Sequence, residues 1–209
     1  MDKKQAEELK EKLFQKKENG WKSKTQEEKQ QIFEYARGYI DYMNQSKTER
    51  EIIATSKKIA EENGFQDIEK IKELKAGDKI YYINHEKSMY LAIIGKDNIE
   101  NGLNIIGSHA DSPRLDLKPN PLYEDSELAF FKTHYYGGIK KYQWTTIPLA
   151  IHGVIVKANG EKVEIKIGED ETDPIFTITD LLPHLAQDQM EKKLKNGIDG
   201  EHHGLMRGE

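Results

Sequence analysis

A histidine and an aspartate two residues apart are the side chains of this sequence best suited to metal chemistry. They lie in the segment 103–113, which reads LNIIGSHADSP. Ile105 and Ile106 predict a short buried strand, and the glycine and proline of the segment mark where regular structure stops. His109 and Asp111 would then follow the carboxyl end of a strand, where open α/β sheets bind their ligands.

The spacing of this pair allows one specific arrangement. In an extended chain, residues two apart point the same way, so the carboxylate of Asp111 can hold one ring nitrogen of His109. The other ring nitrogen could then bind a metal ion, with its tautomer fixed by the acid. A short His-x-Asp motif also arises by chance, and a loop histidine capped by a turn aspartate is the alternative. Spacing alone leaves both interpretations open.

Two helices are predicted ahead of this segment. Thr25–Glu28 and Thr48–Glu51 are capping boxes, in which Thr and Glu satisfy free backbone amides at a helix start. Apolar residues follow each box at helical spacing, over 32–43 and 52–60, and Gly64 is placed to end the second helix. These stripes predict helices that pack against a core.

Strands are predicted on both sides of the pair. Short β-branched and aromatic runs occupy 80–83, 89–94 and 103–106. Asn159-Gly160 separates the runs 153–156 and 162–167, which is the strongest short signal for a hairpin. A further helix is expected with Leu181, Leu182, Leu185 and Met190 on its inner side, and Pro183 is tolerable only in its first turn.

Several later segments occur in the order, and at close to the spacing, of one known family. They are LDLKPNP at 115–121, YYGG at 135–138, Trp144, IPL at 147–149 and GVI at 153–155. Together with the His-Ala-Asp-Ser-Pro box, they resemble the zinc-dependent metallo-aminopeptidases of the aspartyl aminopeptidase and vacuolar aminopeptidase I type. The resemblance runs from about Thr25 to Gly200, which covers only the front part of the family's architecture.

This resemblance implies an α/β fold in two portions. Residues 1–114 would be the N-terminal portion of the catalytic domain, the α/β sandwich of zinc exopeptidases. Residues 115–209 would be part of an inserted, β-rich dimerisation domain. The family forms dimer-based, dodecameric particles, so we expect a homo-oligomer.

The resemblance also assigns roles to three residues. His109 would be a metal ligand, Asp111 its catalytic partner, and His184 a substrate-binding histidine that reaches the active site of a neighbouring subunit. In the family, two zinc ions share one site, where a glutamate is the general base and a peptide is the substrate. The later ligands and that glutamate are expected beyond this chain, so at most one partial Zn²⁺ site is predicted here, without activity in the chain alone. A non-catalytic remnant or assembly subunit is the alternative.

Other polar and aromatic groups are expected to have structural or solvent-exposed positions without a role in catalysis. Glu169-Asp170-Glu171 follows a strand and is interpreted as a solvated turn, and the His202-His203 pair as part of a loose, exposed tail. Tyr136-Gly137-Gly138 predicts a turn with positive φ. Core or interface aromatics are expected at Trp144 and Phe130-Phe131, and a structural role at His152, whereas His85 and His134 carry no usable signal.

Composition excludes several classes of protein. The 209 residues include no cysteine, so disulfides and thiolate metal sites are ruled out and a metal would need nitrogen and oxygen ligands. No apolar run approaches the ~20 residues that span a bilayer, and no membrane partner is expected. Charged residues make up 33% of the chain with a net charge of -5 and no basic face, which argues against a nucleic-acid partner. We expect a cytoplasmic protein, because the N-terminus lacks the apolar core of a signal peptide.

Overall fold

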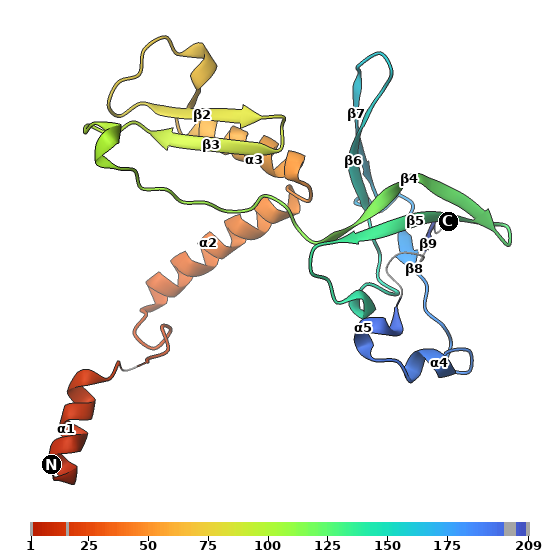
Figure 1. Ribbon diagram of the computed structural model, residues 1–209, viewed down its shortest axis with the longest axis horizontal. Helices are drawn as coiled ribbons and strands as arrows, with labels where there is room; N and C mark the ends of the chain where they lie inside the picture. The colour runs from red at the N-terminus through yellow and green to blue at the C-terminus, as the bar shows by residue number, and fades with distance from the viewer. Residues whose placement is uncertain (1, 16, 199–203, 208–209) are drawn as a thin grey trace. The chain divides into compact units, whose positions relative to one another are not determined.

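The computed structural model of the protein describes residues 2–15, 17–198 and 204–207, the last of these by their backbone (Figure 1). The chain divides into two compact units, Met1–Gln45 and Ser46–Glu209. Within the described part, no helix combines the length and apolar character needed to cross a lipid bilayer.

The first unit contains two helices, α1 (Lys3–Leu13) and α2 (Gln26–Asn44). The predicted capping box begins α2: the Thr25 hydroxyl accepts the Glu28 N–H at 3.2 Å, and the Glu28 carboxylate accepts the Thr25 N–H at 2.8 Å. No residue of α2 is buried, and Phe33 is 60% exposed. The first unit by itself therefore does not provide the predicted core packing for the apolar stripe of α2. Within the unit, the ring of Trp21 lies 5.8 Å from that of Phe33.

The second unit begins with helix α3 and a small sheet in the order β1-β2-β3. Their bounds are α3 (Glu49–Glu62), β1 (Gln66–Asp67), β2 (Lys79–Asn84) and β3 (Ser88–Ile93), with 3-10 turns η1 (Ile68–Lys70) and η2 (Ile99–Asn101). The second capping box begins α3, and the helix buries Ile53 and Ala60, as predicted. Tyr81 of β2 donates a hydrogen bond to Glu61 of α3 at 2.8 Å. This bond fastens the helix to the sheet.

A long antiparallel hairpin follows, formed by β4 (Arg114–Asp125) and β5 (Leu128–Tyr136). Its register shifts between Leu117 and Leu122, so the residues between them bulge out of the ladder. Pro119 and Pro121 lie in this bulge, where their missing N–H groups cost no ladder hydrogen bond. The hairpin belongs to a four-stranded sheet in the order β4-β5-β9-β8, completed by β8 (Phe176–Ile178) and β9 (Gly204–Arg207).

The predicted hairpin around Asn159-Gly160 is confirmed. Strands β6 (Ile151–Val156) and β7 (Lys162–Ile167) pair in antiparallel register, and Gly160 has a φ of 85° in the turn. Its positive φ is the conformation that a glycine adopts without strain.

A small apolar cluster holds these strands together. Phe176 and Ile178 of β8 are buried at its centre. The half-buried side chains packed against them are those of Leu115, Phe131, Trp144, Leu149, Ile151 and Ile167. Trp144 and Phe131 are therefore core aromatics, as predicted.

The helix predicted over 181–190 is mostly absent. Helical structure is limited here to α4 (Gln187–Met190) and α5 (Leu194–Gly197), and η3 (Lys141–Gln143) is another short turn. Leu181, Leu182 and Leu185 lie in an irregular segment and are 55%, 60% and 65% exposed. Pro183 explains the difference, because its ring has no N–H and disfavours a helical conformation in the residue before it.

The C-terminal segment is also more ordered than predicted. Gly204–Arg207 form β9, which pairs with both β5 and β8, so a loose tail is wrong for these residues. His202 and His203 lie outside the described residues.

The strand predicted at 103–106 does not form. Residues 103–113 have no regular structure, and Ile105 and Ile106 are 82% and 99% exposed. A strand requires a hydrogen-bonded partner, and no described strand pairs with this segment. The α/β fold class is nevertheless confirmed by the mixture of helices and sheets, while the predicted domain boundary after residue 114 stays a prediction.

Candidate functional site

The structure brings His109 and Asp111 together. The Nδ1 atom of His109 lies 2.7 Å from the backbone carbonyl oxygen of Asp111 and 3.3 Å from its carboxylate Oδ1. Both neighbours are hydrogen-bond acceptors, so the neutral ring carries its proton on Nδ1 and leaves the lone pair of Nε2 bare. The His109 side chain is 80% exposed, which opens Nε2 to solvent.

A tyrosine from a distant segment holds the other oxygen of this carboxylate. The Tyr136 hydroxyl donates to Asp111 Oδ2 at 2.8 Å across a sequence separation of 25 residues. This bond, followed by one from the Asp111 N–H, holds the pKa of the Asp111 carboxyl below its ordinary value. The same bond raises the pKa of the Tyr136 phenol. Sequence reasoning missed this role of Tyr136, and only its position in the Tyr-Gly-Gly segment could have drawn attention to it.

The residues around Tyr136 fit closely against the His-Ala-Asp-Ser-Pro box. Tyr136 ends β5 and pairs with Arg114, which begins β4. Gly137 has a φ of 73°, and a Cβ atom added there would lie 3.4 Å from Pro113. The predicted positive φ is confirmed at Gly137, and the two sequence motifs form one local structure.

Arg114 connects this structure to helix α3. Its guanidinium lies 4.2 Å from the centre of the Tyr136 ring, a cation–π distance. Arg114 Nε donates to Asp116 at 2.7 Å, and Nη1 lies 3.0 Å from Glu49 at the start of α3. Burial alone would lower the pKa of Arg114, but the hydrogen bond to Asp116 and the charge of Glu49 outweigh it and raise that pKa.

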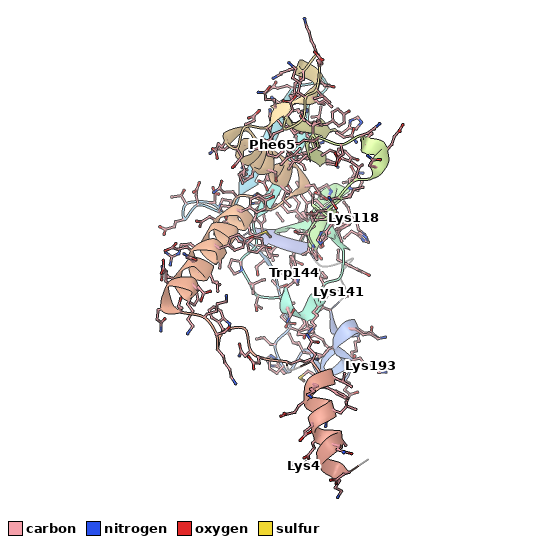
Figure 2. The ribbon with its side chains drawn as sticks, turned by 90° about the vertical axis from the view of Figure 1, so that its left-hand side faces the viewer. Lys4, Phe65, Lys118, Lys141, Trp144 and Lys193 are labelled. Carbon is pink, nitrogen blue, oxygen red and sulfur yellow. The ribbon has the colours of Figure 1, made fainter. Side chains whose placement is uncertain are left out.

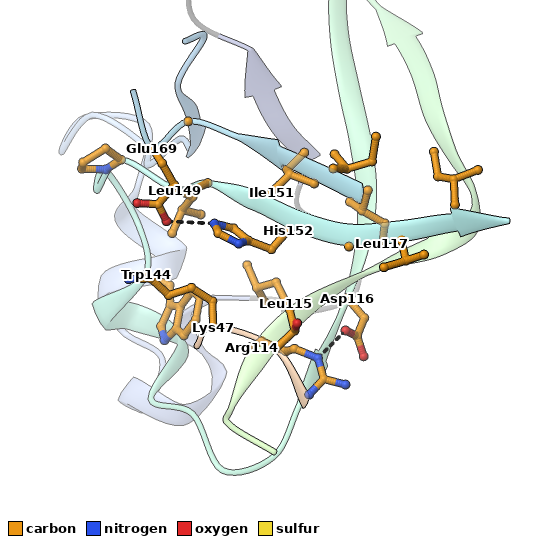
Figure 3. Close-up of a pocket in the computed structure, with 18 residues that line it drawn as sticks. Lys47, Arg114, Leu115, Asp116, Leu117, Trp144, Leu149, Ile151, His152 and Glu169 are labelled. Carbon is orange, nitrogen blue, oxygen red and sulfur yellow. Dashed lines mark hydrogen bonds and ion pairs between the residues drawn. The ribbon is translucent and has the colours of Figure 1, made fainter. Parts of the chain in front are cut away.

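A second histidine, His152 of β6, has both ring nitrogens engaged. Nδ1 lies 2.9 Å from Glu51 of α3. Nε2 lies 2.8 Å from Glu169, which follows β7 (Figure 3). Lys166 also approaches Glu51, at 3.4 Å. With neither nitrogen free, His152 has no lone pair for a metal, which supports the structural role predicted for it. Glu169 was interpreted as part of a solvated turn, and its half-exposed carboxylate in fact binds His152.

Glu51 combines two functions at this junction. Its Oε2 accepts the N–H groups of Lys47 and Thr48, each at 3.0 Å, while its Oε1 contacts His152. Burial alone would raise the pKa of Glu51, but the hydrogen bond and charge of His152, the charge of Lys166 and the Thr48 N–H outweigh it and lower the pKa.

A cavity of about 810 Å³ lies beside His152, between the start of β4 and β6 (Figure 3). Its apolar lining is contributed by Leu115, Leu117, Trp144, Leu149 and Ile151. Arg114, Asp116 and Glu169 add charged groups to the lining. The residues that line it do not include His109 or Asp111, so the cavity and the candidate metal ligand are separate features.

The third predicted site residue, His184, is distant in sequence from His109 and Asp111 and lies in a turn. It occupies the turn Pro183–Leu185 between β8 and α4 and is exposed. Its assignment to substrate binding stays a prediction.

Figure 2 shows that the labelled Trp144 and Lys141 lie on the segment that precedes β6, close to one another.

One described histidine has a geometry that suits a zinc ligand. A catalytic zinc takes three protein ligands and keeps one position open. His109 suits one of these positions, since its Nε2 is exposed and its Nδ1 is held by the backbone carbonyl of Asp111, with the Asp111 carboxylate close by. Among residues 2–15, 17–198 and 204–207, no group of three or more His, Asp or Glu side chains is placed to hold a metal ion.

A family model, a curated relative and a solved structure that match this chain all belong to M18 aminopeptidases. The family model described as Aminopeptidase I zinc metalloprotease (M18) matches residues 42–203. The probable M18 family aminopeptidase 1 of Borrelia garinii subsp. bavariensis is 53% identical over 194 residues, which cover 92% of this chain and 42% of that protein. The crystal structure of an M18 family aminopeptidase from Thermotoga maritima superposes with a TM-score of 0.84 at 41% identity, over 92% of this chain and 42% of that one.

A more distant likeness concerns the fold alone. The mApe1 dodecamer of yeast matches with a TM-score of 0.57 at 22% identity, over 70% of this chain and 36% of that one. The chain spans about two fifths of the length of the curated relatives that it matches, with 42% coverage of the Borrelia protein.

Proposed function

The chain belongs to the aminopeptidase I zinc metalloprotease (M18) family, and on this premise we propose that it supplies part of the zinc centre of an aminopeptidase that removes N-terminal residues from peptides. The single observation that carries the proposal is the geometry at His109. Its Nδ1 is held by Asp111 and its Nε2 is bare and exposed. A histidine held in this way is the usual form of a metal-binding imidazole.

In this proposal each residue has a separate role. His109 donates the lone pair of Nε2, and Asp111 keeps the proton on Nδ1 and stabilises the charge of the site. Zinc, when bound, polarises a carbonyl group and lowers the pKa of a bound water. The remaining ligands and the general base come from polypeptide other than the described residues, so the chain by itself does not hydrolyse peptides.

The finer features of the family follow as part of the same proposal. A complete site would hold two zinc ions, of which this chain would contact at most one. Residues 1–114 would form the N-terminal portion of the catalytic domain and residues 115–209 part of the dimerisation domain. His184, exposed on its turn, is available to reach the active site of a neighbouring subunit in a dimer-based dodecamer. A cytoplasmic location is a further element of the proposal.

Zinc binding by the chain itself tests the role of His109. Zn²⁺ is added to the 209-residue protein labelled with ¹⁵N-histidine, and the ring signals are followed by NMR. We expect the Nε2 signal of His109 to shift and His109→Ala to abolish that uptake. His85→Asn is the matched control, because His85 lies in an exposed turn with a φ of 51° that asparagine tolerates.

Turnover requires a longer chain. We expect a fusion of this chain to the remaining sequence of the Borrelia relative to release amino acids from aminoacyl p-nitroanilides in a zinc-dependent reaction. His109→Ala should then reduce kcat by about a thousandfold or more, since one of three ligands is lost. Retained turnover at full metal content in that variant would refute the assignment.

The same fusion separates the alternative, a non-catalytic remnant or assembly subunit. The observation that favours the alternative is that no group of three or more His, Asp or Glu side chains among the described residues is placed to hold a metal ion. A fusion that folds and assembles but shows no zinc-dependent turnover would support it.

A further inference from the structure

We propose that Tyr136 is a positioning residue for His109, acting through the carboxylate of Asp111. The Tyr136 hydroxyl holds the Asp111 carboxylate beside His109 Nδ1, where that carboxylate supports the metal-bound form of the ring. This inference rests on the proposed function, because it concerns the pose of the same metal ligand. It adds no new ligand to the site.

Asp111 uses each of its three oxygens differently. Its backbone carbonyl oxygen lies 2.7 Å from His109 Nδ1, and its carboxylate Oδ1 lies 3.3 Å from the same nitrogen. The other carboxylate oxygen, Oδ2, accepts the Tyr136 hydroxyl at 2.8 Å. A carboxylate that is bound on one side only can rotate among its rotamers. The tyrosine bond restricts this rotation and keeps Oδ1 directed at the imidazole.

The backbone around Tyr136 is more regular than the backbone around His109 and Asp111. His109 and Asp111 lie in residues 103–113, which belong to no described strand or helix. Tyr136, by contrast, is the last paired residue of β5, opposite Arg114. Backbone pairing in the hairpin therefore fixes the position of Tyr136. The hydrogen bond from the Tyr136 hydroxyl in turn restricts Asp111, in a segment without regular structure.

The ring of Tyr136 is itself held in place by its neighbours. Arg114 lies against one face at 4.2 Å, and Arg114 is anchored by Asp116 and by Glu49 of α3. Pro113 packs against Gly137, the residue after the tyrosine. A continuous series of contacts thus runs from α3 through Arg114, Tyr136 and Asp111 to His109.

A purely structural hydrogen bond is the competing explanation, and it predicts a different observation. Tyr136 is 39% exposed, so removal of its hydroxyl should change the stability of the fold little. If the bond were only structural, the zinc affinity of His109 would not depend on it. The zinc affinity of His109 is therefore the quantity to measure.

The test uses Tyr136→Phe in the 209-residue chain, labelled with ¹⁵N-histidine, at about pH 8, where imidazole is neutral. In both proteins we expect the His109 ring to hold its proton on Nδ1, because the backbone carbonyl oxygen of Asp111, 2.7 Å away, is an acceptor that the substitution does not remove. In the variant we expect a zinc affinity at His109 lower by about tenfold, the lower end of the effect of removing a supporting group. Tyr135→Phe is the matched control, since Tyr135 stacks on His134 at 5.4 Å and should leave the zinc affinity unchanged.

A double-mutant cycle identifies the route. If Tyr136 acts through Asp111, Tyr136→Phe should have no further effect on the zinc affinity of His109 in an Asp111→Asn background. Additive effects would overturn the proposal, and so would a parent-like zinc affinity in Tyr136→Phe. This outcome is distinct from failure of the proposed function, which would appear as absence of zinc binding at His109 in the parent.

A second measurement covers the case in which Tyr136→Phe does not fold. Asp111→Asn alone should shift the ¹³Cζ signal of Tyr136 and leave that of Tyr135 in place. An unchanged Tyr136 signal would overturn the proposal.

Discussion

Two histidines of this chain meet carboxylates in opposite ways. His109 has one nitrogen held by Asp111 and the other open to solvent, on a segment without regular structure. His152 has Glu51 on one nitrogen and Glu169 on the other, and its side chain is only 11% exposed. The first can donate a lone pair to a metal, whereas the second can only link the elements around it. The number of free ring nitrogens, rather than the presence of an acid nearby, separates a candidate ligand from a structural histidine.

The largest effect on stability is expected at His152. His152→Ala removes the common partner of Glu51 and Glu169, and takes from the poorly exposed Glu51 the closer of the two basic side chains at its Oε1, which leaves Lys166 at 3.4 Å. We expect a loss of roughly 2–3 kcal/mol of unfolding free energy, since a buried charge without its partner is costly. Urea unfolding would measure it, with His184→Ala, in an exposed turn, as the control. A loss no larger than that of the control would show that His152 is not a structural link.

Acid should weaken the same junction. The pKa of Glu51 is lowered in the folded protein, so its contribution is present above the unfolded-state pKa and is lost as the pH falls through the folded value. We expect the urea midpoint of the parent to fall as the pH drops below about 4.5, the ordinary pKa of glutamate, and Glu51→Gln to flatten this dependence. Equal slopes in the two proteins would contradict the role of Glu51.

A smaller effect is expected where the other end of α3 meets the sheet. The hydrogen bond to Glu61 is the largest cause that raises the pKa of Tyr81 to about 12, followed by burial. A raised pKa stabilises the fold below the unfolded value of about 10, and this stabilisation is lost as the pH rises toward the folded value. Tyr81→Phe should cost roughly 1–2 kcal/mol at neutral pH and reduce the loss of stability in alkali. An unchanged alkaline transition would contradict this link.

The smallest effect on stability is expected at His109. Its ring is exposed and its polar contacts among the described residues are with Asp111, so His109→Ala should change the unfolding free energy by less than about 0.5 kcal/mol. The same substitution should remove zinc binding, which makes it the converse of His152→Ala. A large loss of stability would place His109 among the structural histidines.

The local features of this fold could be predicted from sequence. The capping boxes at Thr25 and Thr48 depend on groups three residues apart, and the turn at Gly160 depends on the φ that glycine allows. His109 and Asp111 are close for the same reason, because they are separated by a single residue. In each case the interacting groups lie within one or two turns of chain, and the residue types alone specify the contact.

Contacts between distant segments could not be predicted in this way. Ile105 and Ile106 suggested a strand, but a strand needs a partner that sequence pattern does not identify. Tyr136 meets Asp111 across 25 residues, and His152 meets Glu51 across 101. Sequence alone therefore determined helices α2 and α3 with their caps, strands β2, β3, β6 and β7, and the closeness of His109 and Asp111. Only the tertiary structure decided which histidine keeps a free nitrogen, because that depends on carboxylates and hydroxyls brought together by the pairing of remote strands and helices.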